Sequence, residues 1–250
     1  MKCLILAAGY ATRLYPLTEN FPKPLLKVKD KTIIDWLIDD IESSKKIDEY
    51  IIISNHKFVN HFEEWKNNSN LKSKISIIDD GTVSNETRLG AVKDIALAID
   101  EYKLNDDLLV VAGDNVLDFS LVNFIEYFNK KKKTCIMRYY ESNIEKIKKS
   151  ASVLFDSNDK VLEMVEKPSN PNSNWCVPPF YIYESNDVKK VKVALESGCN
   201  YDAPGSFINW LYNKSDVYTM EMPGKRYDIG NLDSYNYVCE NYDGINNREI

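Results

Sequence analysis

The sequence predicts an α/β fold in which a mostly parallel sheet is flanked by helices. The first half of the chain alternates short apolar runs with segments of helical periodicity, which is the pattern of successive βαβ units. The 250 residues are 44% hydrophobic and 28% charged, an ordinary globular composition that excludes disordered, collagen-like and disulfide-scaffold proteins. This length suits one large α/β domain or two small ones.

Strands and helices alternate through the first half. The run Leu108–Ala112 is continuously apolar, as is typical of a buried strand in a parallel sheet. Ile33, Leu37 and Ile41 recur at helical spacing and predict a helix with one apolar face. The expected order is strand 2–6, helix 33–41, strand 50–53, helix 58–65, strand 75–78, helix 89–99, strand 108–112, helix 120–128 and strand 134–138.

Beyond Ser150 the apolar runs become shorter and more β-like. No internal repeat or low-complexity linker separates this part from the first. We expect strands at 152–155, 161–165, 180–183 and 217–222, and helices at 188–195, 205–212 and 232–240.

Charge and cysteine content limit the partners and the compartment. Lysine and arginine number 32 against 38 acidic residues, a net charge of -6, so the chain lacks the basic stripe of a nucleic-acid binder. The apolar run at 3–8 is short for a signal peptide, and no segment reaches the roughly 18 apolar residues of a membrane span. We expect a cytoplasmic protein that binds neither nucleic acid nor membrane. Its five cysteines form no C-x-x-C pair and are expected to be reduced and mostly buried: Cys3, Cys135, Cys176, Cys199 and Cys239.

The most informative stretch is Leu6–Leu25, LAAGYATRLYPLTENFPKPL. The first strand ends in Ala7, Ala8 and Gly9, whose small side chains let a ligand approach the backbone, and Gly9 can take the positive φ of a tight turn. The pattern is neither G-x-G-x-x-G nor G-x-x-x-x-G-K-[ST], so neither dinucleotide binding nor a Walker-type phosphate site is supported.

Two cations follow this loop, at Arg13 and Lys23. Lys23 lies between Pro22 and Pro24, which predicts a stiff, extended segment that aims one ammonium group. A P-K-P sequence alone can be a simple turn. Its pairing with the small-residue loop and Arg13 favours phosphate capture.

Carboxylates appear at two further turns. Gly113-Asp114-Asn115 follows the 108–112 strand, and in a parallel sheet the carboxyl ends of the strands form the ligand-binding edge. A carboxylate among phosphates needs a cation between them, and Mg²⁺ takes one or two carboxylates. Asp228, in YDIGN, is expected in a short turn before a helix. Either could instead be a plain loop or cap residue.

One more motif, Glu166-Lys167-Pro168, ends a β-like run. Its lysine joins the two aspartates, Lys23 and Arg13, and these two carboxylates, two lysines and one arginine suit a metal-assisted phosphoryl site. His56 and His61 form no H-E-x-x-H motif and are interpreted as partly exposed helix residues.

In this order and at these separations, the four motifs resemble the sugar-1-phosphate nucleotidyltransferases, the nucleoside-diphosphate-sugar pyrophosphorylases of the glucose-1-phosphate thymidylyltransferase and uridylyltransferase type. They span Leu6 to Asn231. The resemblance implies a Rossmann-like nucleotidyltransferase fold with an added small mixed sheet over the acceptor site. It also implies one catalytic domain over 1–250, with 1–150 mainly nucleotide-binding and 151–240 mainly acceptor-binding, and no appended acyltransferase domain.

The implied reaction joins a nucleoside triphosphate to a sugar 1-phosphate, with Mg²⁺ and release of pyrophosphate, and makes a polysaccharide precursor. No covalent nucleophile is required, because the attacking phosphate is already anionic. The resemblance assigns catalysis to Arg13, Lys23, Asp114, Lys167 and Asp228, and Mg²⁺ to Asp114 and Asp228. It assigns the nucleotide to Leu6, Ala7, Ala8, Gly9, Arg13, Lys23, Asn85, Gly90, Gly113 and Asp114, and the acceptor to Ala151, Glu166, Lys167 and Pro179.

Departures from the family pattern leave several alternatives open. Ala11 replaces the second glycine of G-x-G-T-R, and Asn85 stands where glutamine is common, so UTP, dTTP and CTP all remain candidates. Ala151 and the V-P-P-F at 177–180 also depart, so the acceptor can be a sugar 1-phosphate or a phosphocholine-like molecule. A non-catalytic regulatory paralogue is disfavoured because every charged site residue is present. A homo-oligomer stays open.

Overall fold

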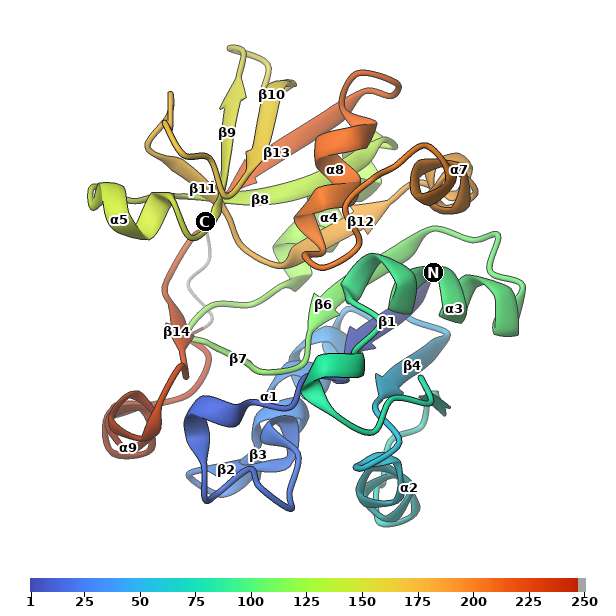
Figure 1. The fold of residues 1–250 in the computed structure, drawn as a ribbon, viewed down its shortest axis with the longest axis vertical. Helices are drawn as coiled ribbons and strands as arrows, with labels where there is room; N and C mark the ends of the chain where they lie inside the picture. Colours follow the sequence, from blue (N-terminus) through green and yellow to red (C-terminus); the bar gives the residue numbers. More distant parts are fainter. Residues whose placement is uncertain (247–250) are drawn as a thin grey trace. The chain divides into compact units, whose positions relative to one another are not determined.

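The computed structural model describes residues 1–246, and contacts within the chain divide it into two compact units. Unit 1 comprises Met1–Arg88, Ala112–Asn123 and the chain from Pro223 onward, and unit 2 comprises Leu89–Val111 and Phe124–Met222. The sequence colouring of Figure 1 shows that both units are assembled from separated segments. The expected division at residue 150 into nucleotide and acceptor parts stays a prediction.

Unit 1 contains a parallel three-stranded arrangement in the order β1-β4-β5. Leu6 pairs with Ile53 and Ser54 with Asp79, so the carboxyl ends of the three strands are aligned. Thr32 caps the N-terminal end of helix α1, where its side chain forms a capping box with Asp35. The elements are β1 Lys2–Leu6, α1 Ile33–Ser43, β4 Glu49–Ser54, α2 Val59–Asn67 and β5 Lys74–Asp79.

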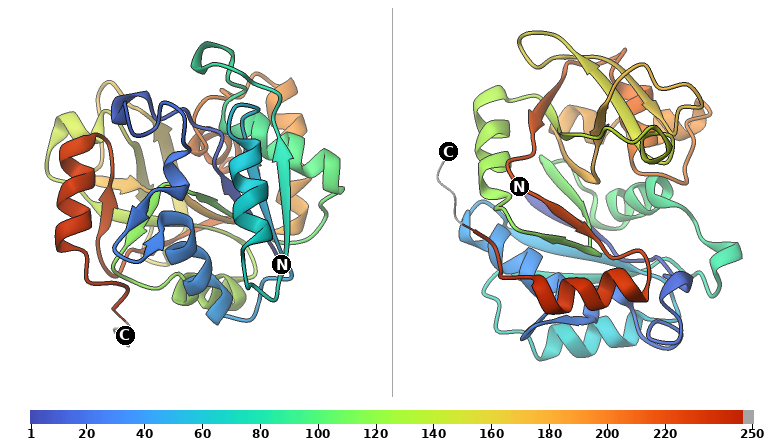
Figure 2. Two further views of the ribbon diagram at one scale, coloured as in Figure 1. Left: turned by 90° about the horizontal axis from the view of Figure 1, so that it is seen from below. Right: turned by 90° about the vertical axis from the view of Figure 1, so that its left-hand side faces the viewer.

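Shorter elements complete unit 1. Strand β7 pairs antiparallel with β14, and β2 pairs with β3 (Figure 2). These strands are two or three residues long, too short for a period-2 pattern to predict. They are β2 Lys27–Val28, β3 Lys31–Thr32, β7 Asn115–Leu117 and β14 Arg226–Asp228, with the last helix α9 at Leu232–Asn241 and 3-10 turns η1 Thr12–Leu14, η2 Lys23–Leu25 and η3 Asn85–Thr87.

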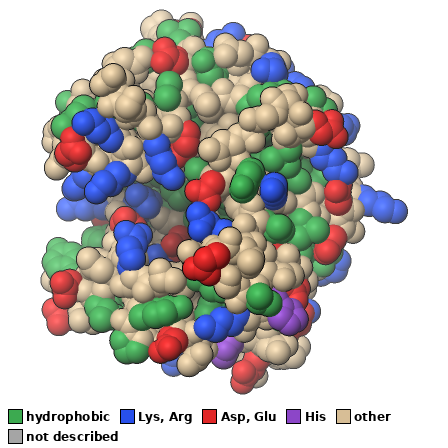
Figure 3. Space-filling view, viewed as in Figure 1, with side chains coloured by type: hydrophobic (Ala, Val, Ile, Leu, Met, Phe, Trp, Pro, Cys, Tyr) green, Lys and Arg blue, Asp and Glu red, His purple; other side chains and the backbone are tan. Residues whose placement is uncertain are grey.

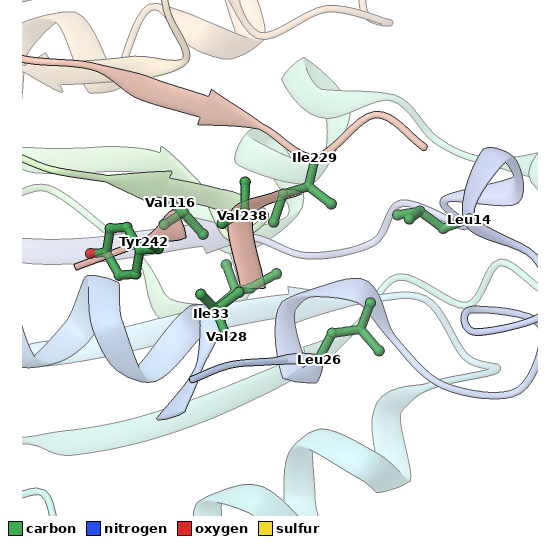
Figure 4. Close-up of a cluster of buried hydrophobic side chains, with 8 residues drawn as sticks. All are labelled: Leu14, Leu26, Val28, Ile33, Val116, Ile229, Val238 and Tyr242. Carbon is green, nitrogen blue, oxygen red and sulfur yellow. The ribbon is translucent and has the colours of Figure 1, made fainter. Parts of the chain in front are cut away.

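A buried apolar cluster joins distant segments of unit 1 (Figure 4). It contains Leu14 from η1 and Ile229 from the turn after β14, which places the start and the end of the chain against one core. The hydroxyl of Tyr242 donates to the Leu117 carbonyl at 2.7 Å, so the one polar group of the cluster is satisfied. Its members are Leu14, Leu26, Val28, Ile33, Val116, Ile229, Val238 and Tyr242. Each large side chain contributes roughly 1.5–3 kcal/mol by leaving water.

Unit 2 is built on largely antiparallel strands in the order β10-β9-β11-β8-β12-β6, with β13 parallel to β8. Its strands are β6 Leu108–Ala112, β8 Thr134–Tyr140, β9 Ala151–Phe155, β10 Val161–Glu166, β11 Trp175–Val177, β12 Phe180–Tyr183 and β13 Val217–Glu221. The remaining helices are α3 Ala91–Tyr102, α4 Val122–Lys131, α5 Ile144–Ile147, α6 Ser185–Val188, α7 Val191–Glu196 and α8 Gly205–Leu211.

The α/β class is confirmed, with parallel strands in unit 1 and a mixed arrangement in unit 2. The helix expected at 188–195 is split into α6 and α7, and His56 precedes α2, where its ring is 2.5 Å from Asp79 Oδ2. The five cysteines are free, three of them buried. No helix within residues 1–246 is long and apolar enough to cross a bilayer. Basic and acidic side chains are interspersed over the face drawn in Figure 3.

Candidate active site

The loop after β1 leaves backbone open to a ligand. Ala7 and Ala8 are buried, and Asn55 Nδ2 donates to the Ala8 carbonyl at 3.0 Å, which holds the chain in place. Gly9 is exposed, and apart from Gly9 and its two chain neighbours no atom of residues 1–246 lies within 4 Å of the position that a Cβ would take there. The predicted close approach to this backbone is therefore sterically available.

The positive φ expected at Gly9 occurs instead at Ala11, with φ 47° and ψ 41°. Ala11 caps the N-terminal end of η1, and Thr18 Oγ1 donates to its carbonyl at 2.8 Å. A left-handed alanine costs roughly 1–2 kcal/mol because its Cβ crowds the following carbonyl. The family glycine that Ala11 replaces would adopt this conformation without that cost.

Arg13 and Asp228 flank Gly230. A Cβ added to Gly230 would lie 3.8 Å from Arg13 Nη1 and 4.0 Å from Asp228 Oδ2. Arg13 is exposed and makes no hydrogen bond or ion pair to any residue of the described range 1–246. Its guanidinium therefore keeps its donors for an anionic ligand.

Lys23 and Asp114 form an ion pair, with 2.8 Å between Nζ and Oδ2. The lysine side chain is 7% exposed and the aspartate side chain 45% exposed. The expectation of an extended segment is wrong beyond Pro22, because Lys23 opens the 3-10 turn η2. Pro24 fits that turn since its missing N–H would have no partner in a first helical turn anyway.

Gly113 brings Asp114 close to β1. The amide of Gly113 donates to the Leu6 carbonyl at 2.9 Å, and a Cβ there would come within 2.8 Å of Ile5 Cγ2. Partial burial raises the pKa of Asp114, but the Lys23 charge and hydrogen bond, together with the Arg226 charge, outweigh it and bring the pKa below its ordinary value. The carboxylate is therefore ionised at neutral pH.

Asp228 ends β14 rather than occupying the expected turn. It pairs across the antiparallel ladder with Asn115, the first residue of β7, and Asp114 lies in the turn immediately before that strand. Asn115 is a positioning residue that was not predicted: its Nδ2 donates to Asp114 Oδ1 at 3.2 Å, and its Oδ1 accepts from Arg226 Nη1 at 2.9 Å. The G-D-N tripeptide was its only signal in the sequence.

These two carboxylates suit Mg²⁺. No group of three or more His, Cys, Asp or Glu side chains that could hold a metal occurs among residues 1–246. Mg²⁺ commonly uses one or two protein carboxylates and completes its shell with water and substrate phosphate oxygens. Asp114 and Asp228 therefore match a metal that is bound together with a phosphorylated substrate, rather than one held by the protein alone.

The predicted base-reading residues lie in different units. Asn85 begins η3 in unit 1, partly exposed, and its side chain makes no hydrogen bond within the described part of the chain. Gly90 caps α3 in unit 2 with φ 92°, where an added Cβ would come 2.6 Å from the Tyr201 carbonyl oxygen. Both the backbone angle and the close packing require glycine at this position. Base contact by either residue stays a prediction.

The predicted acceptor residues gather on neighbouring strands of unit 2. Glu166 pairs with Ala151, which in turn pairs with Val177 of β11. Lys167 follows with φ 48°, and its amide donates to the Ser150 carbonyl at 3.0 Å. Pro179 lies two residues beyond Val177, on the connection to β12. Three separated sequence segments are thus joined by strand pairing.

Glu166 and Lys167 also line a polar groove of about 550 Å³ together with Asn200, Asp202 and Ser206. Burial raises the pKa of Glu166, the Lys167 charge lowers it in part, and the Asp202 charge raises it further. A lysine beside two carboxylates offers an anion site and hydrogen-bond acceptors within one groove.

Comparison with known proteins shows the family of the chain. The Nucleotidyl transferase family model matches residues 2–243, and the chain belongs to that family. It is 27% identical over 248 residues to the bifunctional protein GlmU of Methanococcus aeolicus, covering 96% of this chain and 55% of that protein. It is 25% identical over 233 residues to a glucose-1-phosphate thymidylyltransferase of Neisseria meningitidis, covering 90% of this chain and 75% of that protein.

A crystal structure of apo UDP-glucose pyrophosphorylase shares the fold. The TM-score is 0.83 at 19% identity, covering 96% of this chain and 97% of that one. The chain spans about half the length of the first curated relatives it matches, 50% to 55% of each. Fold and family follow from these matches, and the substrates have to be argued from the site.

Proposed function

We propose that the protein transfers a nucleotidyl group from a nucleoside triphosphate to a sugar 1-phosphate, releasing pyrophosphate and forming a nucleoside diphosphate sugar. The observation that carries this is the arrangement in unit 1, where Asp228 pairs across the strands with the neighbour of Asp114. Lys23 is 2.8 Å from Asp114, and Arg13 adjoins the Gly230 turn beside Asp228. Two carboxylates with two cations suit a triphosphate and its metal.

In this reaction a phosphate oxygen of the acceptor attacks the α-phosphorus in line. The bond from the α-phosphorus to the oxygen bridging it to the β-phosphate breaks, and its electron pair leaves with pyrophosphate. Arg13 and Lys23 bind the triphosphate and neutralise the charge that grows on the leaving group. Asp114 and Asp228 would hold Mg²⁺, which when bound supplies further charge neutralisation. Positioning and electrostatics then account for catalysis without a protein nucleophile.

The acceptor would be held by unit 2. Lys167, exposed beside the polar groove, binds the acceptor phosphate, and Glu166 accepts hydrogen bonds from its hydroxyl groups. Among the relatives are proteins named for glucose 1-phosphate and mannose 1-phosphate, which supports a sugar 1-phosphate over phosphocholine. For the nucleotide we favour UTP, dTTP or CTP, which Asn85 would discriminate.

A substrate matrix tests this proposal. ATP, GTP, CTP, UTP and dTTP are each combined with glucose 1-phosphate, mannose 1-phosphate and phosphocholine, and pyrophosphate is measured with Mg²⁺ or with EDTA. We expect release with at least one pyrimidine triphosphate and one sugar 1-phosphate, dependent on both partners and on Mg²⁺. Pyrophosphate in none of the fifteen pairs would overturn the function, and release only with phosphocholine would overturn the acceptor class.

A further inference from the structure

Gly205 begins helix α8, and its Cα faces the carboxylate of Glu166. A Cβ added to Gly205 would overlap Glu166 Oε2 and would lie 3.1 Å from Met164 Cε and 3.4 Å from the Tyr181 hydroxyl. Only glycine therefore leaves room for the carboxylate in its present place. The expected acceptor motif and the start of α8 meet at this contact.

The backbone on the Gly205 side is anchored. The carbonyls of Tyr201 and Asp202 accept hydrogen bonds from the first amides of α3, from Val92 at 2.9 Å and Ala91 at 3.2 Å. Gly205 itself is buried, as are the next three residues of α8. A larger residue at 205 therefore has little freedom to move away from Glu166.

The Glu166 carboxylate, in contrast, has no hydrogen-bonded anchor in the described part of the chain. It makes no hydrogen bond to any residue within the described range 1–246, although the side chain is partly buried. The Glu166 carboxylate is held by close packing against the start of α8 rather than by hydrogen-bond donors. Both oxygens consequently keep their acceptor capacity for a ligand in the groove that Glu166 and Lys167 line.

We propose that Gly205 is a positioning residue that sets the Glu166 carboxylate for the acceptor's hydroxyl groups. The inference rests on the proposed function, because it takes Glu166 as the acceptor-binding carboxylate. In this proposal Gly205 acts on the Glu166 carboxylate and not on the acceptor directly. Glycine is the one residue type that leaves room for the Glu166 carboxylate to pack against the start of α8.

Gly205→Ala tests the role directly. Alanine favours a helix, and the overlapping atom is the free end of a side chain, so the unfolding midpoint should be equal or higher. The KM for the acceptor that the substrate matrix selects should rise about tenfold, as loss of a hydrogen bond to a charged group does. The KM for the triphosphate should stay within about twofold, since the displaced group contacts only the acceptor.

Two further variants separate positioning from a general packing defect. Glu166→Asp shortens the side chain by one methylene, so adding it to Gly205→Ala should recover part of the lost acceptor affinity. Gly224→Ala is the matched control, because its Cβ would likewise overlap a carboxylate oxygen, that of Asp118, which belongs to no predicted site. Both KM values should be unchanged in that control.

The proposal is overturned if Gly205→Ala leaves the acceptor KM unchanged, raises both KM values equally, or is not relieved by Glu166→Asp. Crystal structures of the wild type and Gly205→Ala give a readout without turnover. Displacement of the Glu166 carboxylate supports positioning, and a shifted α8 with the carboxylate unmoved refutes it. If the wild type releases no pyrophosphate, the proposed function is refuted. The two crystal structures still test whether Gly205 positions the Glu166 carboxylate.

Discussion

Lys23 and Asp114 are 91 residues apart in the sequence, yet Lys23 Nζ lies 2.8 Å from Asp114 Oδ2 in the structure. The lysine is almost wholly buried, whereas nearly half of the aspartate side chain is open to solvent. A buried ammonium on the short turn η2 is held in one place, while the carboxylate it faces stays reachable by a ligand. The pair therefore combines a fixed cation with a carboxylate that a phosphorylated, metal-bound substrate can reach.

Replacing Asp114 by asparagine should lower kcat by about two orders of magnitude or more, as removal of a charge-stabilising group commonly does. The cause would be loss of a Mg²⁺ ligand with little change in shape. Asp39→Asn is the matched control, because it breaks an exposed pair with Lys31, and neither residue belongs to a predicted site. Steady-state pyrophosphate release measures kcat of the two variants. Near-normal turnover of Asp114→Asn would refute the role of Asp114 as a metal ligand.

Ala11→Gly should raise the free energy of unfolding by up to about 1 kcal/mol, because glycine adopts a φ of 47° without the Cβ clash. Urea unfolding measures the change. Ala96→Gly within α3 is the opposite control and should cost about 1 kcal/mol. Destabilisation by Ala11→Gly would show that contacts of the alanine methyl stabilise the fold by more than the backbone strain destabilises it.

Glu49 should contribute stability that depends on pH. Burial acts to raise its pKa, but hydrogen bonds from Lys74, Ser76 and Lys2 outweigh this and lower it from 4.5 to about 2. The folded-state pKa lies below the unfolded one, so the contribution is complete above about 4.5 and is lost as the pH falls toward 2.

Glu49→Gln should therefore lower the free energy of unfolding at pH 7 by roughly 2 kcal/mol, less than the full pKa shift implies because Lys74 is exposed. Urea unfolding of wild type and variant between pH 7 and pH 3 should show the difference shrinking below about pH 4.5. A difference independent of pH would mean that the carboxylate charge is not its source.

Asn85→Gln should change the preference among UTP, dTTP and CTP. The Asn85 side chain makes no hydrogen bond within residues 1–246, so lengthening it breaks no internal hydrogen bond and shifts the position of its amide. We expect the ratio of kcat/KM values between two pyrimidine triphosphates to shift by about tenfold, the scale of one altered pocket contact. If neither Asn85→Gln nor Asn85→Ala changes this ratio, Asn85 does not read the base.

The sequence predicted the long elements because their signals are local. Helix α1 repeats its apolar residues at a helical period, and strand β6 is a continuous apolar run that is buried almost throughout. The missed strands β7 and β14 have three residues each, and neither carries a pattern of its own. They form because each supplies the other's backbone partners.

The sequence by itself determined which charged residues are available and in which order they occur, and this sufficed to indicate the family. Tertiary structure alone decided their partners: Asp228 opposite Asn115, and Gly205 against Glu166. It also decided that the left-handed backbone conformation expected at Gly9 occurs at Ala11. Residue type and periodicity depend on neighbours in the chain, whereas these contacts depend on which distant segments pack together.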